Sequence, residues 1–326
     1  MSKFARVAQT SQSLTLAAME EASRLGLREA DLEHLLLALV ISDQSAGRAL
    51  RSPQVDLAAV RRAVQAQHAE QLASLGIDAP FPESGRIVFH ETSGYEWSRR
   101  SADLLARAGG TGKGGDAAAV LRELVAEPSG QITDLLRRLG TTPDDVLARL
   151  DRLDSPETTP WPAASGRASR STEAFVPAPI EDVWALVADP LRVPEWELSV
   201  GHLDDSGQDL MPGAVWHGHA RLRRTDGKPV RIKPRLRRKR IELVELDRPE
   251  HVAWRVASPD APRSTAILTE FSLTPTTGGT QVTIAITWPE RAGWRRFVGW
   301  PLRPLRTFLV WIVLFQTSSA ISRPFR

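Results

Sequence analysis

The chain of 326 residues contains no cysteine. This absence excludes disulfides, thiolate catalysis and cysteine metal sites, and it fits a reducing cytoplasm, where we expect the protein to reside. The N-terminal segment MSKFARVAQTSQSL lacks the apolar core of a secretory signal, so we expect no export. Apolar residues (42%) and charged residues (25%) are present in the proportions of a globular protein.

The chain also has little net charge, +3, but the charge is unevenly distributed. Residues 171–326 carry 22 Lys and Arg against 17 Asp and Glu, and many of the basic residues lie in KPVRIKPRLRRKR, 228–240. Only alternate residues of an extended segment face the same way, and no aromatic side chains are interleaved for base stacking. We interpret the run as a solvated outer face and expect no nucleic-acid partner.

A phosphate-binding loop is missing as well. GTGKGG contains the right residue types, but Lys113 is followed by Gly114 instead of Ser or Thr, and no strand is predicted before it. We interpret this segment as a surface loop, and we expect no ATPase activity and no cofactor.

Apolar residues at helical spacing dominate residues 1–153. Asp31 precedes the most apolar helix and can accept hydrogen bonds from its first free N–H groups. The stretch DLEHLLLALV, 31–40, returns as DAAAVLRELV, 116–125, which indicates an internal repeat. The predicted helices cover 7–25, 32–40, 60–75, 97–108, 120–125, 132–139 and a segment from 143 onward.

GLREADLEHLLLALVISDQSAGRAL, 26–50, resembles the N-terminal repeat domain of Clp-type AAA+ unfoldases. That domain is a tandem pair of four-helix repeats that docks adaptors or substrate proteins. The resemblance implies an all-α double-repeat domain over 1–153, with Glu33 and His34 in contact with a protein partner. Ala118 and Ala119 stand at the equivalent positions of the second copy.

The segment 154–170 is rich in Pro, Ser, Thr and Ala and has no apolar period, so we predict a flexible linker there. After it, apolar residues alternate with a period of two. We predict a strand at 171–176, a helix at 179–187, and then strands at 198–204, 214–224, 229–246 (interrupted at Pro234), 251–257, 264–274 and 280–288. A helix at about 301–321 follows.

APIEDVWALVADPLRVPEW, 178–196, resembles the START-like (SRPBCC) superfamily of polyketide cyclases, dehydratases and lipid-transfer domains. The resemblance implies an α+β helix-grip fold over 171–326, in which an antiparallel sheet curls around the long helix and an apolar cavity. Pro190 and Pro194 break the first helix at one end of that cavity. We expect a lipid or polycyclic ligand, and the predicted pocket residues are Trp184, Trp196, Trp216, Trp254, Phe271, Trp288, Leu309 and Ile312. For Trp196, an ordinary core position is the alternative.

Catalysis would need an acid–base group held in the pocket. The candidates are His217, His219 and Glu270. His217 and His219 share one face of a strand, and this face is either the inner one or the solvated convex one. A metal would need a third ligand, from Glu242 or Glu270, and nothing local supplies it, so we expect no metal.

FLVWIVLF, 308–315, is apolar all round but far too short to span a bilayer. Three interpretations remain open. The segment is covered by the first domain or by a second subunit in a homodimer, it contacts a membrane surface, or it borders a very wide pocket.

Two functions therefore compete. The first is a non-catalytic cytoplasmic protein that binds a hydrophobic small molecule in the second domain and a protein partner through the first. The second is a polyketide cyclase or dehydratase-type enzyme with the helical domain as a docking module.

Overall fold

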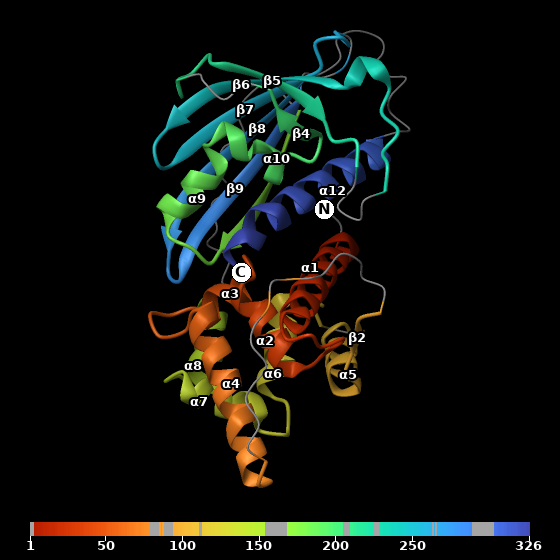
Figure 1. The fold of residues 1–326 in the computed structure, drawn as a ribbon. Coiled ribbons are helices and arrows are strands. Elements are labelled where there is room, and N and C mark those ends of the chain that lie inside the picture. Colours follow the sequence, from red (N-terminus) through yellow and green to blue (C-terminus); the bar gives the residue numbers. More distant parts are fainter. Residues whose placement is uncertain are drawn as a thin grey trace. The chain divides into compact units, whose positions relative to one another are not determined.

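The computed structural model describes residues 3–77, 85, 87, 94–110, 113–153, 168–204, 209–223, 228–262, 264, 266–288 and 303–326. The chain divides into two compact units, Met1–Thr158 and Thr159–Arg326 (Figure 1). We call them the helical domain and the sheet domain. The boundary between them falls inside the segment 154–170, for which the sequence predicts a linker.

The helical domain consists of helices and one small parallel strand pair, in which Ala30 lies beside Trp97. Its elements are α1 (Lys3–Arg24), β1 (Glu29–Ala30), α2 (Leu32–Val40), α3 (Ser45–Leu50), α4 (Leu57–Ser74), β2 (Glu96–Trp97), α5 (Arg99–Ala108), α6 (Ala117–Val125), α7 (Gln131–Arg138) and α8 (Pro143–Leu153).

Helix α2 is buried along its whole length, because it is apolar on every side except at Glu33 and His34. Asp31 caps it: the side chain accepts a hydrogen bond from the Leu32 N–H (2.9 Å), which confirms the predicted cap. His34 completes the capping box, since its Nδ1 accepts from the Asp31 N–H at 3.1 Å. Helix α6 also has nine residues and an aspartate cap, Asp116, 85 positions later. The relation of this domain to Clp repeats remains a prediction.

Helix α3 was not predicted from the sequence. It has only six residues, SAGRAL, too few to establish a period. Gly47 allows it to pack tightly, since a Cβ there would lie 2.0 Å from the carbonyl oxygen of Ser42.

The sheet domain contains seven antiparallel strands in the order β3-β9-β8-β7-β6-β5-β4. The strands are β3 (Ala168–Val176), β4 (Val200–Leu203), β5 (Val215–Ala220), β6 (Arg238–Asp247), β7 (His251–Ala257), β8 (Ile267–Thr276) and β9 (Gly279–Trp288). The helices are α9 (Ile180–Val187), α10 (Val193–Trp196) and α12 (Arg303–Ser322), with 3₁₀ turns at Pro190–Arg192, Pro234–Leu236 and Arg323–Phe325.

Helices α9, α10 and α12 lie on one face of this sheet, which we call the inner face (Figure 1). The 3₁₀ turn that begins at Pro190 connects α9 to α10, and Pro194 lies in the first turn of α10. Asp189 caps the 3₁₀ turn by accepting a hydrogen bond from the Leu191 N–H at 2.8 Å. An antiparallel sheet with the long C-terminal helix against it is the arrangement that the helix-grip prediction requires.

Large rings fill the centre of the inner face. Trp196 packs edge-on against Phe271 with centroids 4.8 Å apart, and Trp216 against Trp254 at 5.7 Å. The indole N–H of Trp254 donates to the carbonyl oxygen of Val187 at 2.8 Å, which fixes the end of α9 to the sheet. These four rings are at most 1% exposed.

Among the described residues, no helix is long and apolar enough to cross a membrane. Helix α12 contacts β3, β9 and α10, and Leu314 is buried while Val313 is 41% exposed. A membrane surface or a second subunit as further cover for this helix remains a prediction.

Candidate functional site

A pocket of about 690 Å³ opens on the inner face, beside the strands β4, β5 and β6. Its wall comes from the segment before β4, the end of β5, the segment between β5 and β6, and Gln316 of α12. This volume is in the usual range for small-molecule sites. The apolar part of the wall consists of Leu198, Ala220, Val230, Ile232 and Leu236.

Three basic side chains, Arg221, Arg223 and Lys239, line the same pocket. Lys239 faces inward because it alternates with the buried Ile241 and Leu243 along β6. Burial lowers the pKa of Lys239, against the opposing charge of Glu197. Its Nζ lies 3.4 Å from the hydroxyl of Ser258.

Sequence reasoning missed Lys239, because the run 228–240 was interpreted as a solvated outer face. That interpretation holds for Arg238 and Arg240, which are exposed on the other face. A usable signal was present: extending the alternation of Ile241 and Leu243 backward by one step places Lys239 on the inner face.

The predicted pocket residues lie mostly in the packed core. Trp184, Trp196, Trp216, Trp254 and Phe271 are buried, and none of them lines the described pocket. Trp288 and Ile312 are half-buried, and the side chain of Leu309 lies outside the described residues. The predicted aromatic residues therefore pack against one another in the core, and other residues form the described pocket.

The three catalytic candidates are directed away from this pocket. His217 is exposed and paired with Arg240 across the β5–β6 ladder, on the convex face. His219 shares that face, and Glu270 lies on it with its Oε2 accepting from the Thr287 hydroxyl at 3.5 Å. Glu242, considered as a third metal ligand, is held instead by Arg255 at 3.1 Å.

In the helical domain, Glu33 and His34 are 5% and 2% exposed. Glu33 accepts a hydrogen bond from Gln131 at 3.0 Å, and its other oxygen lies 3.5 Å from Nε2 of His68. Burial raises the pKa of Glu33, but His68 and His34 outweigh burial and bring it below its ordinary value. The hydrogen bond to Glu33 raises the pKa of His68, whereas burial lowers that of His34. The role of Glu33 and His34 in partner binding remains a prediction.

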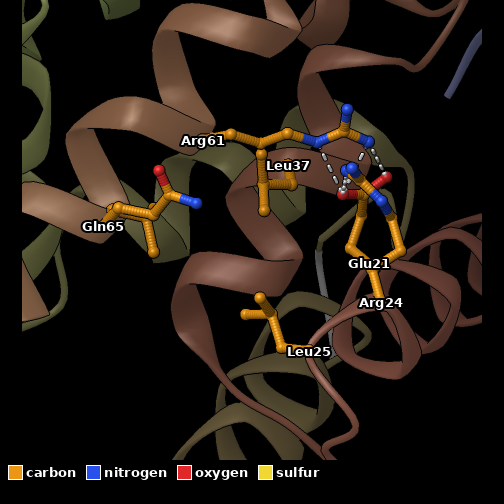
Figure 2. A pocket seen from close by; sticks show the side chains of 7 residues that line it. Glu21, Arg24, Leu25, Leu37, Arg61 and Gln65 are labelled. Carbon is orange, nitrogen blue, oxygen red and sulfur yellow. Dashed lines mark hydrogen bonds and ion pairs between the residues drawn. The ribbon is translucent and has the colours of Figure 1, made fainter. Parts of the chain in front are cut away.

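A smaller pocket, of about 20 Å³, lies between α1, α2 and α4 (Figure 2). Arg61 forms a bidentate ion pair with Glu21, with Nη2 2.7 Å from Oε1 and Nε 3.0 Å from Oε2. Arg24 reaches the same carboxylate at 3.5 Å, and Leu37 lies beneath the pair (Figure 2). A space of this size holds about one water molecule, which is too small for an organic ligand.

The glycine-rich segment around Lys113 follows a helix, α5, and Lys113 is paired with the carboxylate of Glu123. This lysine therefore already has an anionic partner from its own domain. The absence of nucleotide binding remains a prediction.

Comparison with known proteins finds a family match within the sheet domain. Residues 167–308 match the family described as polyketide cyclase / dehydrase and lipid transport. Among curated proteins, none matches the chain.

Solved structures give fold likenesses at low identity. They include protein CV1439 from Chromobacterium violaceum (18% identical, 48% of this chain and 97% of that chain, TM-score 0.31). Ms6760 from Mycobacterium smegmatis is 19% identical over 48% of this chain and 87% of that chain, with a TM-score of 0.31. DynU16, a protein in the dynemicin biosynthetic locus, is 20% identical over 46% and 45%, with a TM-score of 0.30. No statement about the function of this chain follows from likenesses at this level.

Proposed function

We propose that the sheet domain, a domain of the polyketide cyclase / dehydrase and lipid transport type, binds a hydrophobic small molecule that carries an anionic group. The observation that carries this proposal is the inner-face pocket, in which an apolar wall adjoins Lys239, Arg221 and Arg223. An apolar chain or ring system fits against Val230, Ile232 and Leu236, and a carboxylate fits against the ammonium group of Lys239.

Binding without catalysis is the function that we place first. Among the described residues that line the pocket there is no aspartate, glutamate or histidine. A cyclase or dehydratase needs a group that takes up or gives a proton near its working pH. Burial lowers the pKa of Lys239, and the carboxylate whose charge acts on it, Glu197, does not belong to the described lining of the pocket. The cyclase or dehydratase function remains the alternative.

The test uses the full chain with dodecanoate and dodecanol, which share one apolar chain and differ in charge. Binding is measured by displacement of a bound apolar dye and by native mass spectrometry. We expect dodecanoate to bind with the higher affinity and to raise the melting temperature, since a ligand at a hundredfold excess over its Kd stabilises the fold by about 2.7 kcal/mol.

Two variants make the test specific to this pocket. Leu236→Glu places a charge on the apolar wall and should abolish dye and dodecanoate binding. Leu222→Glu is the matched control, because Leu222 is 49% exposed and does not line this pocket. Unchanged binding in Leu236→Glu, or equal loss in both variants, would contradict the proposal.

We further propose that the helical domain docks a protein partner. The resemblance at 26–50 supports this role, and Glu33 is the residue to test. Because Glu33 is buried, Glu33→Ala perturbs the fold, whereas Glu33→Gln keeps the volume and removes the charge. A partner captured by the full chain should bind Glu33→Gln more weakly, with the thermal stability of the variant measured alongside. Unchanged partner affinity in a folded Glu33→Gln protein would exclude Glu33 from the interface.

A further inference from the structure

Three polar side chains converge on the convex face at the β4 edge of the sheet. His202 of β4 and His219 of β5 are direct partners in the ladder, and their rings stack with centroids 5.0 Å apart. Asp204 follows β4, with Oδ1 3.5 Å from Nε2 of His202 and Oδ2 3.2 Å from Nε2 of His219. One ligand atom from each of the three lies within 4.8 Å of the others.

An irregularity in β4 brings these residues together. Val200 pairs with Ala220, but the next pair is His202 with His219, so Gly201 is an extra residue in the strand. In a regular strand, His202 would share the face of Val200, which is fully buried in the core. The extra residue turns His202 to the convex face instead. A Cβ at position 201 would lie 2.9 Å from Cα of Arg221, so glycine permits the close approach.

The position of Asp204 is also fixed by the backbone. Its N–H donates to the carbonyl oxygen of His217 at 2.8 Å, which extends the β4–β5 ladder by one step beyond the strand. The carboxylate is therefore held beside both imidazoles by main-chain geometry, even though the side chains are exposed.

Two imidazole nitrogens and one carboxylate oxygen are a donor set that zinc and similar transition-metal ions accept. Metal–ligand bonds of about 2.0–2.1 Å in tetrahedral geometry place donor atoms roughly 3.3–3.5 Å apart. The two carboxylate–imidazole spacings, 3.5 and 3.2 Å, are of this size, but each joins a different oxygen of Asp204 to a nitrogen, so the carboxylate must rotate for one oxygen to serve with both nitrogens. The imidazoles are solvent-exposed, at 66% for His202 and 44% for His219, and can rotate to complete the geometry.

We propose that His202, Asp204 and His219 form a binding site for a divalent transition-metal ion of the zinc class. This site goes beyond the proposed function, because it lies on the face opposite the ligand pocket. Three protein ligands leave a coordination position open. Both histidines line a groove of about 480 Å³ whose wall also contains Arg221, Arg223 and Arg237, so a water molecule or a small anion completes the coordination.

The experiment titrates Zn²⁺ into the full, untagged chain in competition with a chromophoric chelator, and records the visible absorption of the Co²⁺ form. We expect one ion per chain and a Co²⁺ spectrum of nitrogen and oxygen ligands. His202→Ala, His219→Ala and Asp204→Asn should each weaken Zn²⁺ binding by roughly tenfold or more, because each removes one of three ligands.

The matched control is His217→Ala, since His217 lies on the same strand and the same face but outside the group of three. It should bind Zn²⁺ with the affinity of the parent chain. The proposal would be overturned by the absence of saturable Zn²⁺ binding, by parental affinity in the three ligand variants, or by a loss in His217→Ala as large as in those variants. Equal competition by Mg²⁺, which prefers oxygen ligands, would also overturn it.

Discussion

Replacing Lys239 by methionine should change stability and ligand binding in opposite directions. The side chain keeps its length and apolar stem and loses its charge. Burial lowers the pKa of Lys239 in the folded state below its value of 10.5 in a free side chain. At a pH below the pKa of Lys239 in the folded state, the charged lysine therefore lowers the free energy of unfolding. This loss of stability disappears as the pH rises from that pKa through 10.5, where the side chain is neutral in both the folded and the unfolded state.

The magnitudes follow from the contacts. The contact between Lys239 Nζ and the Ser258 hydroxyl is long, at 3.4 Å, so its loss changes the stability little. Because Lys239→Met also removes a half-buried charge, the variant should be as stable as the parent or more stable by up to about 1 kcal/mol. A bound carboxylate loses a charge-assisted hydrogen bond of about 1.5–3 kcal/mol, which weakens dodecanoate binding roughly 10- to 150-fold. Dodecanol binding should change little, because the alcohol carries no charge.

The assay combines urea unfolding at neutral pH with dye displacement by dodecanoate and dodecanol. Arg240→Met is the control, because Arg240 is the next residue in β6 and faces the convex side. In Lys239→Arg the charge persists at high pH, so dodecanoate affinity should fall with rising pH in the parent chain and stay constant in this variant. The reasoning fails if Lys239→Met keeps parental dodecanoate affinity, or if Arg240→Met loses as much.

Other predictions concern the core, the helix cap and the linker. Trp254→Ala should lower the free energy of unfolding by about 3–5 kcal/mol in urea titrations. Trp254→Phe should lower it by less, because the hydrogen bond to Val187 and part of the ring volume are lost but one buried ring is kept. A loss below about 1 kcal/mol in Trp254→Ala would show that the ring is not core. Burial raises the pKa of Asp31, but hydrogen bonds from Arg100, Ser98 and Leu32 hold it at about 2, below the value of 3.8 for a free side chain. The stability that this carboxylate contributes is therefore complete above pH 3.8 and is lost as the pH falls through 2. We expect the parent to be more stable than Asp31→Asn by about 1–2 kcal/mol at pH 6, and this difference should shrink toward pH 2 in acid titrations. A difference that stays constant down to pH 2 would show that it does not come from this carboxylate. Limited proteolysis should cut first within 154–170 and yield two folded fragments, whereas early cuts inside 180–288 would argue against two domains.

The order of elements in the sheet domain could be predicted from the sequence, because period two and turn residues mark each strand. The predicted 251–257 coincides with β7. The strand predicted over 229–246 was wrong in its first part, because β6 begins only at Arg238, after the 3₁₀ turn at Pro234–Leu236. In the helical domain, the prediction of 32–40 coincides with α2, whose aspartate cap and continuous apolar run mark both ends. Single turns such as α3 left no period to detect.

The sites were harder to predict. Alternation shows which side chains face inward, but not whether the interior between them is empty. Trp196, Trp216, Trp254 and Phe271 do face inward, and they fill the space by packing on one another.

For the histidines, spacing along the chain suggested His217 with His219, because those two share a strand face. The group of three depends instead on the register of β4 against β5, and that register depends on one extra glycine. No local pattern in GHLDD marks that residue as extra, so only the pairing of the strands reveals it.

Two proposed binding regions, the inner-face pocket and the histidine groove, meet at the end of strand β5. Ala220, Arg221 and Arg223 line both the inner-face pocket and the histidine groove, so one short piece of backbone belongs to both walls. A ligand that displaces this backbone alters the spacing of His219 relative to His202 and therefore the affinity for the metal. Thermodynamic linkage makes this effect reciprocal. If the bound metal changes the affinity for the ligand by some factor, the bound ligand changes the affinity for the metal by the same factor. Through this shared backbone, the concentration of the free metal ion influences how much of the protein has an apolar ligand in the inner-face pocket.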